Sequence, residues 1–163
     1  MENPGRLVER LQKEGLRTLA FFQHLAPNDW EVKIYSDGSQ WTARQVLAHF
    51  VSAEEAAVQL ILNILAGGDG AAVDFDIELF NEREVAEKLH FTPAELLEQF
   101  GQARQASVSL VNALSTQDLQ RAGRHPFLGW TTLEEIIKLL YRHNQIHQRD
   151  IRRTVLGYPA RTG

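Results

Sequence analysis

The chain contains no cysteine, and this absence removes several kinds of chemistry at once. Without cysteine there are no disulfides, no thiolate ligands for a metal and no cysteine nucleophile. Any thiol chemistry performed by the protein would therefore need a thiol supplied from outside.

Long apolar runs and a strong excess of one charge are also lacking. No apolar run approaches the roughly 20 residues of a membrane span, and no signal-peptide apolar segment follows Met1. Seventeen Lys and Arg stand against 21 Asp and Glu, for a net charge of -4 spread without long runs of one sign. Nucleic-acid-binding domains carry a basic surface instead. We therefore expect a cytoplasmic protein with neither a membrane nor a nucleic-acid partner.

Helical periodicity dominates the 163 residues, which suit one compact domain spanning residues 1–163. Four starts are marked by a capping residue, and three of these have Glu or Gln three positions later, as in a capping box. Proline or glycine marks most of the ends. The four amphipathic helices are predicted from Asn3 to Pro27, from Thr42 to Ala66, from Thr92 to Leu114 and from Thr132 to Leu156.

The connection over residues 67–91 is too long for a tight turn between neighbouring helices. Residues 76–89 within it have the pattern of a short extra helix. Such a link can cross the bundle from one end to the other. The sequence therefore predicts an all-α four-helix bundle of up-down-down-up order, in which the helices of residues 42–66 and 132–156 run antiparallel.

His143 and His147 lie four positions apart in the last predicted helix, so both imidazoles point to the same side of it. They continue an apolar stripe through Ile136 and Leu140, which places them on the inward face. His49 occupies a similar inward position in the helix of residues 42–66. Three histidine nitrogens with open positions are a common form of catalytic metal site.

The heights of the histidines along their helices test this idea. At about 1.5 Å per residue, His49 lies about 10 Å from the start of its helix and His147 about 14 Å from the end of its own. These two ends adjoin if the helices are antiparallel, whereas in a parallel arrangement His147 would lie about 23 Å from the relevant end. The crossover and the three-histidine site therefore support each other.

The other histidines and the tryptophans are not expected to bind a metal. His24 lies near the end of a helix, where a protonated imidazole favours the helix dipole, and His90 and His125 lie in connections. The tryptophans flank helix boundaries, where we expect packing at the bundle ends; they are Trp30, Trp41 and Trp130. Asn144 occupies the position of the glutamate in the metalloprotease motif HExxH, so peptide hydrolysis is disfavoured. Asn81 and Asn144 are candidates for contacts around the site, and equally for capping or packing.

Nearly the whole chain resembles the DinB family of bacterial damage-inducible-type proteins, which includes bundles similar to thiol-dependent transferases and maleylpyruvate isomerases. The resemblance rests on three segments, which are Trp41 to His49, Phe80 to Glu82, and Gly129 to Glu134 ahead of the histidine pair. It implies a divalent metal, zinc or nickel, held by His49, His143 and His147. It also implies an up-down-down-up bundle and a homodimer.

Three functional interpretations remain open from the sequence. The first is a metal-dependent enzyme acting on a small molecule by thiol transfer or hydrolysis, with a low-molecular-weight thiol as cosubstrate. Residues 27–40 and 81–90 would then lie at the same end of the bundle and line the pocket. The second is a non-catalytic binding or stress-response module, in which a metal, if any, joins the helices and has a fourth protein ligand. The third is a metal-free bundle with hydrogen-bonded core histidines.

Overall fold

The structure, a computed structural model, describes residues 2–157 of the chain. Its long helices begin where the capping signals predict. The Thr42 hydroxyl accepts a hydrogen bond from the Gln45 amide, and the Gln45 side chain accepts one from the Thr42 amide. Thr92 and Glu95 form the same reciprocal cap. The α-helices are α1 (Pro4–Gln23), α2 (Ala43–Leu65), α3 (Ile77–Lys88), α4 (Pro93–Asn112) and α5 (Leu133–Val155).

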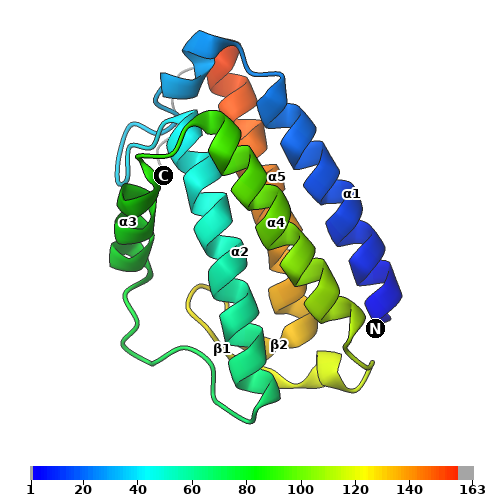
Figure 1. Ribbon diagram of the computed structural model, residues 1–163. Helices are drawn as coiled ribbons and strands as arrows, with labels where there is room; N and C mark the ends of the chain where they lie inside the picture. Colours follow the sequence, from blue (N-terminus) through cyan, green and yellow to red (C-terminus); the bar gives the residue numbers. More distant parts are fainter. Residues whose placement is uncertain (1, 158–163) are drawn as a thin grey trace.

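Four of these helices form the bundle, and α3 lies outside it on the crossover between α2 and α4. In Figure 1, α1 (blue) and α5 (orange to red) run upward, while α2 (cyan) and α4 (green) run downward. The order is therefore up-down-down-up, with α2 antiparallel to α5. The all-α four-helix bundle with a long crossover is confirmed. No described helix is both long and apolar enough to cross a membrane.

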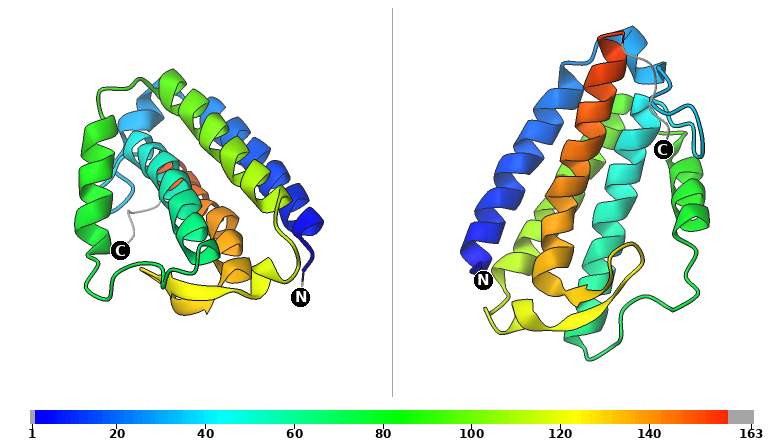
Figure 2. Two further views of the ribbon diagram at one scale, coloured as in Figure 1. Left: turned by 60° about the horizontal axis from the view of Figure 1, so that its bottom comes forward. Right: turned by 180° about the vertical axis from the view of Figure 1, so that it is seen from behind.

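A short β-hairpin precedes α5, and the sequence did not predict it. Strand β1 (Ala122–His125) pairs antiparallel with β2 (Gly129–Thr132), with Ala122 opposite Thr132 and His125 opposite Gly129. The crossover adds to the other edge of β1, where Gly70 pairs with Arg124. The right-hand view of Figure 2 shows the hairpin loop (yellow) beside α2. Two short 3₁₀ helices, Pro27–Glu31 and Asp118–Gln120, complete the regular elements of the described chain.

Two apolar clusters fill the interior of the bundle, one toward each end. The first surrounds the start of α5 and includes Leu11, Ile61, Val111 and Ile136. The second surrounds the start of α2 and includes Phe22, Phe50, Phe100 and Ile151. Both clusters draw on α1, α2, α4 and α5, so hydrophobic burial holds all four helices together.

A buried polar network also joins the four bundle helices. The guanidinium of Arg104 on α4 donates to the Glu54 carboxylate of α2, and Ser107 donates to the same carboxylate at 2.6 Å. Arg104 also donates to the backbone carbonyl of Leu11 in α1. The Asn144 amide of α5, oriented with its oxygen toward Arg104, accepts at 3.0 Å. Because an unpaired buried charge is costly, this network favours one relative placement of the helices.

Candidate metal centre

The three predicted histidines meet between α2 and α5. Nε2 of His143 lies 3.0 Å from Nε2 of His49 and 2.9 Å from Nε2 of His147. Within the described chain these three side chains form a group whose potential ligand atoms all lie within 4.8 Å of one another. A tetrahedral zinc ion with bonds of about 2.05 Å would hold its nitrogens roughly 3.3 Å apart, close to this spacing. The group could therefore hold a metal ion.

Burial keeps the imidazoles neutral. It lowers the pKa of His49 to about 3 and that of His147 to about 4, and the pKa of His143 falls well below its usual value. For His49 and His143 the neighbouring imidazoles lower the pKa further, because two cations this close would repel each other. Neutral imidazole is the form of histidine that binds metals.

The contacts among the three Nε2 atoms do not suit hydrogen bonding alone. A neutral ring nitrogen carries either one proton or one lone pair, so Nε2 of His143 can satisfy only one of its two neighbours. Protonating a ring to supply a second donor is opposed by the lowered pKa values. A divalent cation accepts all three lone pairs at once, so the donor set fits a metal ion.

Tyr35 and Asp150 fix the orientation of His147. The Tyr35 hydroxyl donates to Oδ2 of Asp150 at 3.0 Å and lies 2.5 Å from Nδ1 of His147. Since the single hydroxyl proton points to Asp150, the second contact is a bond donated by Nδ1–H of His147. The proton then sits on Nδ1 and leaves a lone pair on Nε2, directed at the cluster. Hydrogen bonds of this kind orient histidine ligands in metal sites.

The cluster is enclosed mainly by aromatic rings. Phe50 lies 5.6 Å from the His143 ring and 5.7 Å from the His147 ring, between centroids. The Trp41 indole packs on His49 at 4.7 Å. Nδ1 of His49 is buried with no hydrogen-bond partner among the described residues. His49 is buried, whereas His143 and His147 are half-buried, so the cluster keeps an accessible side on α5.

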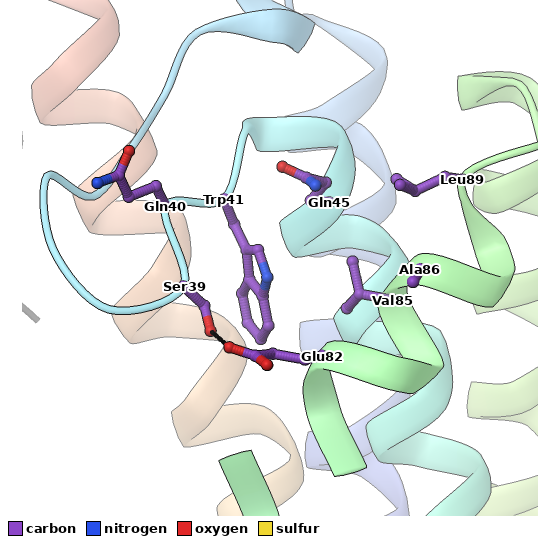
Figure 3. A pocket seen from close by; sticks show the side chains of 8 residues that line it. All are labelled: Ser39, Gln40, Trp41, Gln45, Glu82, Val85, Ala86 and Leu89. Atoms are coloured by element: carbon purple, nitrogen blue, oxygen red, sulfur yellow. Dashed lines mark hydrogen bonds between the residues drawn. The ribbon is translucent and has the colours of Figure 1, made fainter. Parts of the chain in front are cut away.

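A pocket of about 190 Å³ adjoins the cluster through Trp41. Figure 3 shows the indole in the pocket, facing α3, and the hydrogen bond of 3.2 Å between Ser39 and Glu82. The two segments predicted to line a pocket do so together with the first turns of α2. The lining residues are Ser39, Gln40, Trp41, Gln45, Glu82, Val85, Ala86 and Leu89.

The remaining candidates lie outside the cluster. His24 caps the end of α1 through a contact of 2.6 Å between its Nδ1 and the Ala20 carbonyl, and His90 packs on Phe91. Trp30 stacks on Phe22, as end packing requires, and Trp130 is exposed on the hairpin. Asn144 belongs to the Arg104 network, and Asn81 lies in α3, outside the bundle. Trp41 differs from expectation, because it contacts His49.

Sequence reasoning missed Tyr35 and Asp150. A signal for Asp150 was present, since it follows His143 and His147 at the next helical repeat and so lies on the same face of α5. Tyr35 lies 112 positions before His147 in a loop without periodicity. Nothing in the sequence pattern connects the two.

The fold and the three-histidine cluster together define a helical-bundle protein with a candidate metal centre. The family model of the DinB superfamily matches residues 6–151. The chain belongs to this superfamily, as the sequence motifs indicated.

Solved structures show the same fold at low sequence identity. YfiT from Bacillus subtilis, described as a probable metal-dependent hydrolase with an unusual four-helix bundle topology, superposes with a TM-score of 0.75 at 17% identity, covering 96% of this chain and 89% of its own. A mycothiol-dependent maleylpyruvate isomerase superposes with a TM-score of 0.72 at 11% identity, covering 91% of this chain and 60% of its own. The colibactin self-resistance protein ClbS, solved with double-stranded DNA, superposes with a TM-score of 0.72 at 10% identity, covering 94% of this chain and 97% of its own. Among the curated proteins, no sequence matches significantly.

These likenesses establish the fold and leave the partners as predictions. The DNA in the ClbS structure is a counterexample, within this fold, to our expectation that no nucleic acid binds. That expectation rests on the net charge of -4 and on the lack of long runs of one charge. The homodimer and the small-molecule substrate likewise remain predictions.

Proposed function

We propose that the protein binds one divalent metal ion, zinc or nickel, through Nε2 of His49, His143 and His147, and that it is a metal-dependent enzyme acting on a small molecule. The observation that carries this proposal is the convergence of the three Nε2 atoms, at 2.9 and 3.0 Å, in a buried and aromatic setting. Neutral imidazoles so arranged lack mutual hydrogen-bonding partners and suit a shared cation.

The described residues offer no fourth ligand, and this favours catalysis over a structural role. Among the described residues, the potential ligand group has three members and contains no carboxylate. Structural zinc sites have four protein ligands, whereas catalytic sites have three and an open position. A bound divalent ion would act as a Lewis acid on a water or thiol at that position. Tyr35 and Asp150 would fix the orientation of the His147 ring. Trp41 and Phe50 would limit the access of water to the ion.

Within this class we favour thiol-dependent transfer. The chain has no cysteine, so the thiol would be a low-molecular-weight cosubstrate. The mycothiol-dependent isomerase supports the idea, because it performs thiol-dependent chemistry on the same fold. The pocket beside Trp41 offers room for a small molecule between α2 and α3.

Metal content tests the site directly. Protein purified without a tag should carry about one zinc or nickel ion per chain by elemental analysis, and His147→Ala should lose it. His90→Ala is the matched control, because it removes an imidazole that packs on Phe91 outside the cluster. Metal content that is unchanged in His147→Ala would rule out the proposed ligands.

The coordination of the metal and the activity of the protein distinguish an enzyme from a bundle in which the metal is only structural. X-ray absorption of the loaded protein should show three imidazoles and at least one exchangeable light ligand. A fourth protein ligand would instead support the non-catalytic module. When a low-molecular-weight thiol is mixed with an electrophilic acceptor, the wild-type protein should accelerate the loss of the thiol, and His147→Ala should not.

A further inference from the structure

Charge is distributed unevenly over the molecule. Helices α1 and α5 together carry nine Lys or Arg and five Asp or Glu, a net charge of +4. The remaining residues therefore carry -8, since the whole chain carries -4. Figures 1 and 2 show α1 beside α5, and α3, which contains four glutamates, on the opposite side of the bundle from α1. The net charge thus conceals one basic side.

Eight of the basic residues form two exposed stripes, one on each helix. Within each stripe the residues are separated by steps that keep them on the same side of the helix. All eight side chains are exposed, and we refer to them together as the basic face. They are Arg6, Arg10, Lys13 and Arg17 on α1, and Arg142, Arg149, Arg152 and Arg153 on α5.

Contacts between the two helices join the stripes. The guanidinium of Arg10 on α1 lies 5.3 Å from the centroid of the Tyr141 ring on α5. The guanidinium of Arg152 on α5 lies 5.4 Å from the centroid of the Phe21 ring on α1. These cation–π contacts hold two of the guanidinium groups at the boundary between the helices. The stripes therefore make one continuous surface.

Ion pairs neutralise only part of this surface. Arg10 and Arg17 share a single carboxylate, that of Glu14, at 3.5 and 2.9 Å. Arg142 pairs with Glu135 at 3.0 Å. The arginine side chains in these pairs stay between 49% and 60% exposed. Ion pairs so exposed to solvent contribute little free energy, so the guanidinium groups can bind another anion at small cost.

The dimensions and composition of the basic face suit a row of phosphates. Each stripe extends over eleven residues, or about 17 Å of helix. Phosphates of one strand of duplex DNA advance about 3.4 Å along the axis, so this length spans about five of them. Seven of the eight residues are arginine, whose planar guanidinium donates two parallel hydrogen bonds to a phosphate.

A lipid surface suits the basic face less well. A helix that lies on a membrane inserts its apolar side among the lipids. The apolar sides of α1 and α5 are instead buried in the two core clusters of the bundle. Only charge would then hold the protein to a membrane.

We propose that the basic face binds the phosphate backbone of double-stranded nucleic acid without regard to sequence. The inference goes beyond the proposed function and does not depend on the metal. It replaces the expectation drawn from the net charge. Screening at physiological salt limits electrostatic forces to about 8 Å, which is less than the diameter of one helix. The acidic residues on the far side of the bundle therefore do not prevent binding.

Two triple variants with the same change in net charge isolate the basic face. The first carries Lys13→Gln, Arg142→Gln and Arg153→Gln, which remove three exposed cations from it. The matched control carries three substitutions of exposed cations outside α1 and α5, namely Lys33→Gln, Arg83→Gln and Arg121→Gln. Circular dichroism during heating checks that both variants fold.

Fluorescence anisotropy of a labelled 20-base-pair duplex, titrated with each protein in 50 mM salt, measures binding. We expect the wild type and the control to bind equally, and the basic-face variant at least tenfold more weakly. Two duplexes of unrelated sequence should bind equally, because phosphate contacts carry no sequence information. Equal affinity of the wild type and the basic-face variant, or equal weakening of both variants, would overturn the inference.

The salt dependence of the wild type gives a test that needs no variant. A plot of log K against log salt should fall with a slope of about -0.9 for each phosphate contacted, and the slope of the basic-face variant should be shallower by about 2.7. A flat plot would overturn the inference. So would binding to vesicles of phosphatidylcholine and phosphatidylserine without binding to the duplex, which would assign the basic face to a membrane.

Discussion

Tyr35 joins the loop before α2 to the three-histidine cluster. Its hydroxyl lies between Nδ1 of His147 and the buried carboxylate of Asp150, and its ring packs edge-on against the imidazole. One phenol thus fixes both the tautomer and the direction of a proposed ligand. This loop also contributes Ser39 and Gln40 to the adjacent pocket, so a molecule bound there would contact the same segment that orients His147.

Tyr35→Phe should weaken metal binding while leaving the ligands in place. The change removes one oxygen, so the proton on Nδ1 of His147 loses its acceptor, and loss of such outer contacts lowers metal affinity about 10-fold to 100-fold. Chelator competition measures the affinity. Tyr141→Phe is the control, because Tyr141 lies in the apolar cluster near the start of α5. If both variants bound metal as tightly as the wild type, the orienting role would be wrong.

At the scale of residues, the sequence identified the three histidines of the candidate site but not the residues that orient them. His49, His143 and His147 stand out because each interrupts an apolar helical stripe, and periodicity is visible in one chain. Asp150 follows the same helical repeat, so its position beside the histidines could have been predicted from the sequence. The contact of Tyr35 could not, because contacts from an irregular loop depend on tertiary structure alone.

At the scale of elements, the hairpin depends on the close approach of Gly123 to α2. A Cβ added there would lie 2.5 Å from two atoms of Ile64 and 3.3 Å from the Asp69 carbonyl. Ile64 is 3% exposed and cannot move aside into solvent. Glycine is therefore needed at this position for contact rather than for backbone conformation.

Gly123→Ala should destabilise the protein by about 1–3 kcal/mol, the usual cost of overpacking. Gly101→Ala is a matched substitution on α4, where the new methyl would lie 3.9 Å from Leu19 in ordinary contact. It should stabilise the protein by about 0.5–1 kcal/mol, because glycine inside a helix carries an entropic cost. Urea unfolding of both variants measures the difference. Similar changes of the same sign would contradict the packing argument.

The helices could be predicted and the hairpin could not. Caps such as Thr42 and Thr92 act through bonds to residues three positions away, so local sequence specifies them. Strands β1 and β2 have four residues each and begin with Ala122 and Gly129, which carry no strand signal. They form because they pair with each other and because β1 packs on α2.

At the scale of the whole molecule, four neutral imidazoles link stability to pH. Burial lowers the folded-state pKa of His49 to about 3 and of His125 and His147 to about 4, and His143 is lowered as well. In the unfolded chain each returns to about 6.5. Below pH 6.5 the unfolded state therefore binds protons that the folded state does not.

The metal-free protein should keep its full stability above about pH 6.5 and lose it as the pH falls toward 4. Each group contributes up to about 1.4 kcal/mol per pH unit in that window. Urea unfolding at pH 7, 6 and 5 measures the slope. His147→Gln should reduce the slope, because it removes one of these four imidazoles. An unfolding free energy that stays flat between pH 6.5 and 5 would contradict the prediction.

The overall topology was predictable because two independent features agreed. The length of the crossover allowed α2 and α5 to run antiparallel, and the heights of His49 and His147 matched better in that arrangement than in a parallel one. The Arg104 network could not be foreseen, since its partners Glu54 and Leu11 lie 50 and 93 positions away. Local periodicity does not indicate which buried charged residues on different helices contact each other.

The 94 positions between His49 and His143 also determine when the proposed metal centre can form. During synthesis α2 and α4 emerge with a single imidazole of the three, and α5, the last described helix, supplies the other two. Contacts over such a separation form only after a long loop has closed. Metal loading should therefore follow assembly of the bundle, unlike in a zinc finger, where the ion organises the nascent chain. A chain truncated before α5 would lack His143 and His147, and we expect it to bind no ion at this site.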